Sequence, residues 1–341
     1  MRYIFELNHP KHYYQFRVVM HKLEAQGHEL LVLARDKDVL LKVLEEEHVP
    51  YEVFGQHNKS MAKKIWGTFA LLHNYHRIAR QFKPDVIVSK ASFYGCFTAW
   101  RMRKKSVIFP DSEVVKVTNK YVVPLCTKVV TPENFTLDYG PKHIKVKGVF
   151  ENCYLAPSVF TPDASVVKKF GLSQPYAVFR FVGWFANHDV KNSGFTLEEK
   201  IQMVKAVEPY MHVYVSSEKT LPEELAPYKL PTPASAIHHV LSFADLYLGD
   251  SQTMATEAAL LGTPAIRSNS FVGEHDMSNF IMLEKTYGLL RNVPNFEEVM
   301  PLLREFASVS QKAVWVEKQQ SYFASVGDSN AEILDILTHK L

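Results

Sequence analysis

Short apolar segments alternate with helical segments along the first part of the chain, and this order constrains the fold more than any other feature. Residues 2–7, 29–34 and 51–54 are apolar runs of strand length, and residues 13–26 and 38–47 between them have helical spacing. Parallel strands need a long crossover connection, which a helix supplies. The βαβαβ order therefore predicts a parallel sheet with helices on its faces.

A second alternating series follows residues 150–161, a stretch without a clear period that is expected to be a linker. Its strands are expected at 177–182, 212–216 and 244–248. A chain of 341 residues is long enough for two domains. We therefore expect an α/β protein with two tandem Rossmann-like domains. Their expected bounds are 1–153 and 154–341, with the last helix as a candidate to cross back to the first domain.

The composition narrows the class of protein. The net charge of +3 is too small to suggest nucleic acid as the main partner. The three cysteines are widely spaced and form no C-x-x-C pair, so they are expected to be reduced and mostly buried. The chain begins with a strand pattern instead of a secretory signal, and no apolar run approaches membrane-spanning length. We expect a cytoplasmic protein.

Residues 249–264, GDSQTMATEAALLGTP, predict a buried strand that ends in a polar turn and opens into a helix. Asp250, Ser251 and Thr253 are all residue types that cap helices. The first N–H groups of a helix carry the positive end of its dipole, so a phosphate fits there. Glu257 follows Thr253 by four residues, on the side where its carboxylate can accept hydrogen bonds from ribose hydroxyls. The alternative is a capped helix that binds nothing.

Two loops of the first domain carry candidate catalytic groups. Asn8, His9, Lys11 and His12 follow the first strand, where a histidine is well placed to act as a general base. The alternative is that His12 caps the helix and Lys11 is solvated. Asp111 and Glu113 follow a later strand, and either carboxylate can orient or deprotonate an acceptor. An ordinary Pro-Asp turn explains that stretch equally well.

The loop after the first strand of the second domain is a candidate diphosphate clamp. Gly183, His188 and Asp189 lie in it, and the loop continues with Asn192 and Ser193 as further donors. The alternative is a turn whose histidine has a structural partner. The D-x-D pattern at Asp36 and Asp38 is rejected as a metal site, because Asp38 has the position of a helix cap. The histidine spacing also predicts no metal site.

The segment 60–82 places Trp66 and Phe69 beside Lys63 and Arg77. A basic amphipathic helix of this kind can lie on an anionic membrane surface. Most such helices pack their apolar face on a sheet instead. Peripheral contact with the inner face of a membrane is therefore the lesser expectation.

These motifs together resemble those of the GT-B superfamily of nucleotide-sugar enzymes along nearly the whole chain. The most similar family is an uncharacterised, glycosyltransferase-like bacterial and archaeal one with N-x-P-x-H, V-G-W…H-D and G-D-S-x-T-M-x-T-E-A-A-L-L-G-T-P motifs. The last motif is similar to the donor-binding segment of the peptidoglycan N-acetylglucosaminyltransferase and of the non-hydrolysing UDP-N-acetylglucosamine 2-epimerase. The resemblance implies that Ser251, Gln252 and Thr253 bind phosphates and that Glu257 binds ribose.

The resemblance also assigns roles to two histidines. The loop histidine of the peptidoglycan transferase falls on His12 when the following helices are aligned, which implies a catalytic or acceptor-side role. The glycines of that loop are replaced here by Asn8, Pro10 and Lys11. A histidine of the epimerase that meets the diphosphate falls in the region of His188. The G-T-R-P-E run of the epimerase is absent, which counts against epimerisation.

From these patterns we expect an inverting, metal-independent glycosyltransferase without a bound cofactor. The expected donor is a UDP-sugar, and the expected acceptor is a glycan or a lipid-linked molecule of surface polysaccharide synthesis. Ligands of such sheets bind beyond the carboxyl ends of the strands, so the active site is expected in the cleft between domains. His12, or else Asp111 or Glu113, would deprotonate the acceptor. The alternatives are a sugar-nucleotide 2-epimerase and a non-catalytic module that binds sugar nucleotides.

Overall fold

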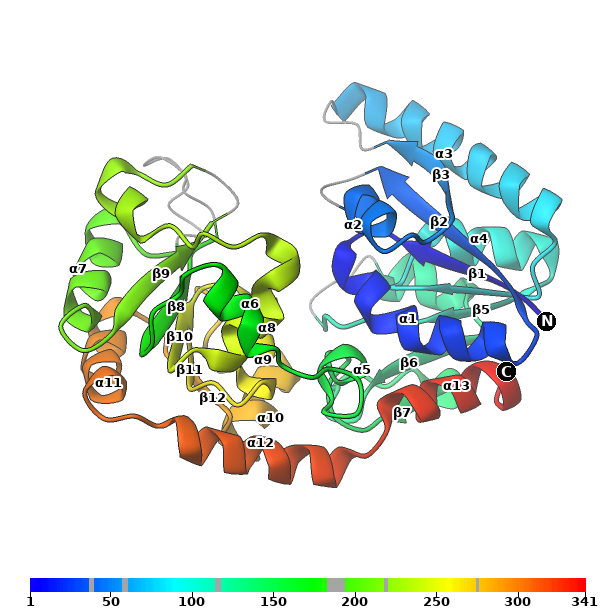
Figure 1. Cartoon of the computed structure of the whole chain (residues 1–341). Coiled ribbons are helices and arrows are strands. Elements are labelled where there is room, and N and C mark those ends of the chain that lie inside the picture. The colour runs from blue at the N-terminus through cyan, green and yellow to red at the C-terminus, as the bar shows by residue number, and fades with distance from the viewer. Residues whose placement is uncertain (37–39, 57–60, 114–117, 183–193, 218–219, 274–275) are drawn as a thin grey trace. The chain divides into compact units, whose positions relative to one another are not determined.

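The computed structural model covers residues 1–341 and describes all of them except 37–39, 57–60, 114–117, 183–193, 218–219 and 274–275. For residues 56, 61–66, 118 and 119 it describes the backbone alone. The chain forms two compact units (Figure 1). Unit 1 contains Met1–Tyr154 and Asp328–Leu341, and unit 2 contains Leu155–Gly327. The last fourteen residues of the chain therefore belong to unit 1. The expected bounds assigned these residues to the second domain, with the last helix as a candidate to cross back.

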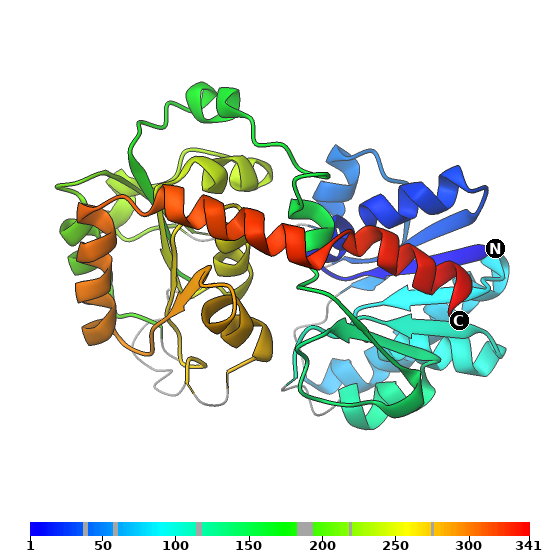
Figure 2. The same ribbon diagram turned by 90° about the horizontal axis from the view of Figure 1, so that it is seen from below.

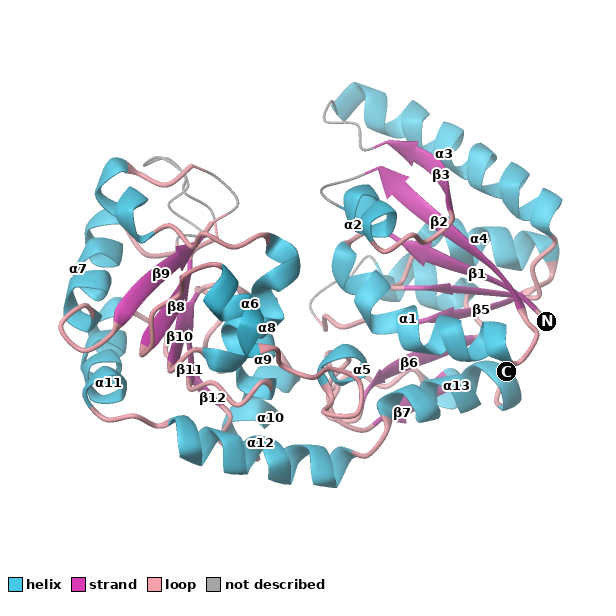
Figure 3. Ribbon diagram, viewed as in Figure 1, coloured by secondary structure: helices cyan, strands magenta, loops and turns pink. Residues whose placement is uncertain are grey.

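Unit 1 is built on a parallel sheet of seven strands in the order β3-β2-β1-β4-β5-β6-β7. The strands are β1 (Arg2–Leu7), β2 (Glu29–Asp36), β3 (Tyr51–Gln56), β4 (Val86–Ser89), β5 (Lys105–Ile108), β6 (Lys128–Pro132) and β7 (His143–Val146). The helices are α1 (Pro10–Ala25), α2 (Leu40–Glu46), α3 (Met61–Phe82), α4 (Phe93–Met102) and α13 (Ser329–His339), and α5 (Asn152–Leu155) lies at the border of the two units. Figure 3 shows the strands as one layer with helices on both faces.

Side-chain alternation along β1 explains the two faces of this sheet. Tyr3, Phe5 and Leu7 point to a core that is completed by α1, α2 and α13. Ile4 points the other way, to a core formed with α3 and α4. A strand buried on both faces is expected to be apolar throughout, as β1 nearly is. In Figure 2, α13 lies beside α1, against which it packs.

Unit 2 has a parallel sheet of five strands in the order β12-β11-β10-β8-β9. The strands are β8 (Tyr176–Arg180), β9 (His212–Ser216), β10 (Leu246–Gly249), β11 (Ala265–Arg267) and β12 (Leu290–Asn292). The α-helices are α6 (Ala164–Lys169), α7 (Leu197–Val207), α8 (Ile237–Phe243), α9 (Gln252–Leu260), α10 (Ser278–Lys285), α11 (Phe296–Ser308) and α12 (Lys312–Val326). The α/β class with two Rossmann-like domains is confirmed.

The starts of two helices are explained by their N-caps. The first helix begins at Pro10 instead of residue 13, because Pro at the first helical position has a favourable φ and His9 caps it. The helix α9 begins at Gln252, since Ser251 is the cap. Within the described residues, no helix is both long enough and apolar enough to cross a membrane.

Candidate functional site

Both sheets contain a point at which the strand order reverses. In unit 1 the chain runs outward from β1 to β3, and then from β4 to β7 on the other side. In unit 2, β9 lies on one side of β8, and β10 to β12 lie on the other. The connecting segments diverge at such a point, and the crevice beyond the carboxyl ends of the two strands is where open α/β sheets bind ligands. The candidate residues of each unit follow these strands.

In unit 2, the turn from β10 to α9 lies at this reversal point. Ser251 is the N-cap of α9, and its Oγ accepts a hydrogen bond from the backbone N–H of Met254 at 3.3 Å. Gln252 and Thr253 form the first residues of the helix and are half-buried. The positive end of the helix dipole therefore points out of the carboxyl edge of the sheet.

Asp250 connects this turn to the neighbouring strand instead of capping the helix. Its Oδ1 accepts the backbone N–H of Val182, just after β8, at 2.6 Å. Its carbonyl oxygen accepts the side-chain amide of Asn269, after β11, at 3.1 Å. Burial raises the pKa of Asp250 to about 6, although the Val182 hydrogen bond and the charge of Lys200 oppose the shift. Asp250 thus ties together the loops after three adjacent strands.

Glu257 contacts a histidine that the sequence analysis did not single out. Its Oε1 lies 3.1 Å from Nε2 of His238 on α8, and both side chains are largely buried. The ring of Phe160 packs edge-on against His238. The carboxylate of Glu257 is therefore held in one orientation, one helical turn into α9.

A buried arginine fixes the loops behind this turn. Arg267 at the end of β11 is fully buried and forms a two-pronged ion pair with Asp276, with distances of 2.7 and 2.9 Å. It also donates to Asn292 at the end of β12 and stacks on the ring of Phe280. Paired carboxylate and guanidinium groups of this geometry are among the stronger hydrogen-bonded contacts in proteins. The expected diphosphate loop with Gly183, His188 and Asp189 lies outside the described residues.

In the turn from β1 to α1 of unit 1, two histidines accept hydrogen bonds from different backbone N–H groups. The N-cap of α1 is His9, whose Nδ1 accepts the backbone N–H of Lys11 at 3.1 Å. His12 is therefore not the cap, in contrast to the structural alternative considered above. Instead, Nδ1 of His12 accepts the backbone N–H of Asn8 at 3.2 Å. Asn8 in turn donates its side-chain amide to Oε1 of the buried Glu6 at 3.0 Å.

Four charged side chains gather next to this turn, from the segments that follow β4, β5 and β7 and from α1. Oδ2 of Asp111 lies 3.4 Å from Nζ of Lys11 and 3.2 Å from Nζ of Lys90, which follows β4. Lys11 also pairs with the buried Glu151 at 2.7 Å. Of the two lysines, Lys90 is the more deeply buried, with 6% of its side chain exposed against 16% for Lys11, whereas 40% of the Asp111 side chain is exposed.

The pKa values in this cluster follow from burial and charge. Burial lowers the pKa of His12 well below its usual range, and the positive charge of Lys90 adds to this effect. Burial raises the pKa of Asp111, but the charges of Lys90 and Lys11 outweigh it and hold that pKa below its ordinary value. Burial lowers the pKa of Lys90, with Asp111 opposing. The cluster thus favours a neutral histidine beside an ionised aspartate.

Glu113 belongs to a different arrangement from Asp111. Its Oε1 accepts the backbone N–H of Thr136 at 2.6 Å and the hydroxyl of Thr136 at 3.0 Å. These contacts connect Glu113 to the loop after β6. The structure therefore brings Asp111, Lys11 and His12 together and orients Glu113 toward another loop.

Sequence reasoning missed Lys90, Glu151, His238 and Arg267. Lys90 directly follows the buried strand VIVS, so the strand-end rule that selected Asp111 had the signal needed to find it. Glu151 and His238 carry no such signal, because their partners are 140 and 19 positions away in sequence. Among the described residues, no three metal-ligating side chains gather to form a possible ion site.

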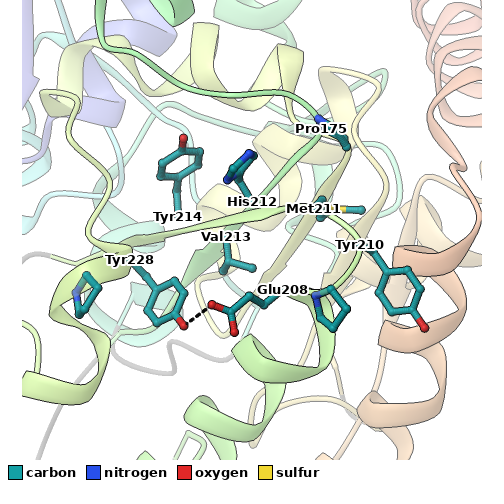
Figure 4. A pocket seen from close by; sticks show the side chains of 10 residues that line it. Pro175, Glu208, Tyr210, Met211, His212, Val213, Tyr214 and Tyr228 are labelled. Atoms are coloured by element: carbon teal, nitrogen blue, oxygen red, sulfur yellow. Dashed lines mark hydrogen bonds between the residues drawn. The ribbon is translucent and has the colours of Figure 1, made fainter.

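A pocket of about 410 Å³ lies at the other edge of the unit 2 sheet, near the amino ends of β8 and β9 (Figure 4). Its polar groups bind one another: the Tyr228 hydroxyl donates to Glu208 at 2.7 Å, and Lys205 donates to the second oxygen of Glu208 at 2.9 Å. Its walls are largely tyrosine, proline and methionine side chains, including those of Pro175, Tyr210, Met211 and Tyr214. This pocket is therefore distant from the carboxyl edge that carries Asp250 and Ser251.

Comparisons with known proteins agree with this architecture. A model for a family of proteins of unknown function, DUF354, matches residues 3–286. An uncharacterised protein of Methanocaldococcus jannaschii is 22% identical over 279 residues, which are 76% of this chain and 80% of that protein.

Two solved structures share the fold. The UDP-GlcNAc 2-epimerase from Methanocaldococcus jannaschii has a TM-score of 0.70 at 14% identity, over 99% of this chain and 100% of that one. A spinosyn rhamnosyltransferase complexed with thymidine diphosphate has a TM-score of 0.63 at 12% identity, over 99% and 100% of the two chains. At these identities the likeness establishes a common fold.

Proposed function

We propose that this chain, which belongs to the DUF354 family of proteins of unknown function, is a glycosyltransferase. It would transfer a sugar from a nucleoside diphosphate, UDP in the first instance, to a glycan or lipid-linked acceptor of surface polysaccharide synthesis. The reaction would be inverting and would proceed without a metal ion. Structures of the same fold include a transferase with a bound nucleoside diphosphate and an epimerase named for a UDP-sugar, which supports a nucleotide-sugar ligand.

The observation that carries this proposal is the turn from β10 to α9 at the reversal point of unit 2. The backbone N–H groups at the start of α9 and the hydroxyls of Ser251 and Thr253 suit a diphosphate. Glu257 stands one turn further on, fixed by His238, where a ribose hydroxyl can donate to it. Electrostatic stabilisation of a departing diphosphate is commonly the largest contribution of an enzyme to such a reaction.

The acceptor would bind to unit 1, at the turn from β1 to α1. Asn8, His9 and Lys11 would contact it, and the base that removes its proton is expected among His12, Asp111 and Glu113. General-base catalysis of this kind contributes about 10²- to 10⁴-fold in rate.

Thermal unfolding in the presence of nucleotides and nucleotide sugars tests the donor site. A ligand at 100 times its Kd adds about 2.7 kcal/mol to the stability of the unit that binds it. We expect a UDP-sugar to raise the unfolding temperature, and Thr253→Val to reduce that rise. Ser321→Ala, which removes an exposed hydroxyl from α12, is the matched control. If no nucleotide stabilises the protein, the proposed donor site is wrong.

A 2-epimerase is the second candidate, because an epimerase shares the fold over the full length of the chain. Incubation with UDP-N-acetylglucosamine in heavy water separates the two functions. An epimerase that eliminates and re-adds the nucleotide would introduce deuterium at C2 without an acceptor. A transferase would leave C2 unlabelled. Binding without labelling or transfer, with any donor and acceptor tested, would favour a non-catalytic module.

Contact of α3 with a membrane remains a prediction. Phe69 of this helix is 65% exposed, and Trp100 on the neighbouring α4 is 58% exposed. Co-sedimentation with anionic vesicles measures such contact. We expect Phe69→Ser to reduce any sedimentation and neutral vesicles to retain little protein.

A further inference from the structure

The hydrogen bonds of the β1–α1 turn point to a division of labour in unit 1. We propose that His12 acts as a neutral hydrogen-bond donor through Nε2, and that Asp111 takes the acceptor proton. Lys90 is the positioning residue that orients Asp111. This inference rests on the transferase function proposed above and selects one of the three candidate bases.

The tautomer of His12 follows from its partner. A backbone N–H can only donate a hydrogen bond, so Nδ1 of His12 must accept from Asn8 with its lone pair. In a neutral imidazole one nitrogen accepts and the other carries the proton. The proton of His12 therefore lies on Nε2, and that nitrogen has no lone pair with which to remove a proton from a substrate.

The surroundings of His12 oppose a second proton. Such a proton would sit on Nδ1 and face the N–H of Asn8. The charged and titratable groups that act on the ring are Lys90 from the end of β4, Asp111 from the end of β5, and His9 and Lys11 from α1. Of these, only Asp111 favours the charged ring. His12 is therefore a neutral donor across the neutral pH range.

Asp111, in contrast to the neutral His12, is charged. Lys11 and Lys90 both contact its Oδ2, with distances of 3.4 Å and 3.2 Å from their Nζ atoms. Lys90 is fixed in turn by Oε1 of the buried Gln15 at 2.9 Å and by the face of the Phe150 ring. The carboxylate is therefore ionised and oriented, with one oxygen able to accept a proton.

The transfer step balances with these roles. The acceptor hydroxyl gives its proton to Oδ1 of Asp111, and its oxygen forms the bond to the anomeric carbon of the sugar. The bond from that carbon to the diphosphate oxygen breaks, and its electron pair leaves with the diphosphate. The Nε2–H of His12 donates to another oxygen of the acceptor and keeps its proton throughout.

Nitrogen NMR of the histidine rings tests the tautomer without any substrate. Long-range ¹H–¹⁵N spectra of the full chain distinguish a protonated from an unprotonated ring nitrogen, and His12→Gln identifies the signals of His12. We expect Nε2 to be protonated and Nδ1 unprotonated, with no change as pH falls through 6.5. His21, exposed on the same helix, provides a second histidine whose ring signals can be compared with those of His12. Protonation of His12 on Nδ1, or on both nitrogens at pH 6.5, would overturn the proposal.

Turnover of an identified donor tests the division of labour. The side-chain amide of Gln places an N–H donor near the position of Nε2. His12→Gln is therefore expected to keep its turnover rate within about tenfold of the wild type, whereas His12→Ala is expected to lose about 10²- to 10³-fold in rate. Asp111→Asn is expected to lose about 10²- to 10⁴-fold in turnover rate. Lys90→Met is expected to raise the pKa at which the rate falls on the acidic side of the pH–rate profile. His21→Gln is the matched control. Equal losses in His12→Gln and His12→Ala, with both variants folded, would identify His12 as the base.

The two experiments separate the failure of this inference from that of the proposed function. If the chain turns over no sugar nucleotide, the transferase function is wrong, while the ring spectra still decide the tautomer of His12. If the chain is an active transferase and His12 proves to be protonated on Nδ1, the inference alone is wrong.

Discussion

Asp250 shows how a single side chain can make the donor site sensitive to pH. Burial raises its pKa to about 6, and its Oδ1 nevertheless accepts the N–H of Val182. A carboxyl group whose pKa is higher in the folded chain stabilises the fold below its unfolded pKa. That contribution is lost as pH rises through the folded value. Above pH 6 the group is therefore an anion next to the start of α9, where it repels another anion.

We therefore predict that the affinity for a UDP-sugar falls as pH rises from 5 to 7.5. The diphosphate of a nucleotide sugar does not titrate in this range, so the change belongs to the protein. Asp250→Asn keeps an oxygen for Val182 and removes the charge. It is expected to bind more tightly at pH 7.5 and with little pH dependence. Calorimetry in buffers of different ionisation enthalpy should also show proton uptake by the wild-type protein near pH 6. Proton release on binding would contradict this account.

Ser251 has two roles, and two substitutions separate them. Its Oγ accepts the N–H of Met254, and among the described residues its hydroxyl has no acceptor. Ser251→Ala loses the cap and is expected to cost about 1 kcal/mol of unfolding free energy, whereas Ser251→Gly costs only a few tenths. Both variants lose the donor and are expected to bind a UDP-sugar more weakly. Denaturant unfolding and calorimetry measure the two effects. Equal affinity in Ser251→Gly and wild type would exclude a hydroxyl contact with the ligand.

At the scale of elements, α13 shows how a distant segment completes unit 1. Its buried residues Ile333, Ile336 and Leu337 lie in the same core as α1 and β1. The Tyr3 hydroxyl donates to the carbonyl oxygen of Leu337 at 3.0 Å. The first strand of the chain and its last helix are therefore parts of one packing unit.

We predict that Ile336→Ala destabilises unit 1 by about 2–5 kcal/mol, as expected for a large aliphatic side chain removed from a core. Hydrogen exchange measured by mass spectrometry should accelerate in α1 and β1 and stay unchanged in β10 and α9. His339→Ala, at an exposed position of the same helix, is the control. Equal acceleration in both units would show that α13 does not act through unit 1 alone.

The alternation of strands and helices was sufficient to predict the fold class, because the central strands are apolar runs and the helices between them have helical spacing. The starts of helices were less predictable where several neighbouring residues can act as the N-cap. Pro10 and His9 started α1 early, and Ser251 prevailed over Asp250 and Thr253 as the cap of α9.

The candidate site was predictable only in part. The loops at strand ends follow from the sheet order, which is why His12, Asp111 and Ser251 were found. The partners of these residues depend on packing between segments that are far apart in sequence. The approach of Glu151 to Lys11 has this origin. The tautomer of His12 depends on a backbone hydrogen bond that no residue pattern encodes.

At the scale of the whole molecule, the chain is divided in an uneven way between its two units. Unit 2 is one continuous segment, Leu155–Gly327, whereas unit 1 needs both ends of the chain. Within unit 2, α12 is held by Trp315, whose ring N–H donates to Leu289, and by Lys312, whose amine donates to three oxygens. Unit 2 therefore contains all the described residues of the proposed donor site and its own core.

We predict that the fragment 155–327 folds alone and binds a UDP-sugar within about tenfold of the full chain, or about 1.4 kcal/mol. The fragment 1–154 is expected not to fold, because it lacks three buried side chains worth about 2–5 kcal/mol each. That loss is comparable to the whole stability of a domain, about 5–15 kcal/mol.

A fusion of 1–154 to 328–341 through a short Gly-Ser linker should restore folding. The side-chain amide of Asn330 donates to the carbonyl of Cys153 at 2.9 Å, so the two ends lie close together. Circular dichroism and thermal unfolding compare the fragments, and the fusion with Ile336→Ala is the control. A fragment 1–154 as stable as the fusion would show that the last helix is dispensable, and that unit 1 is complete without it.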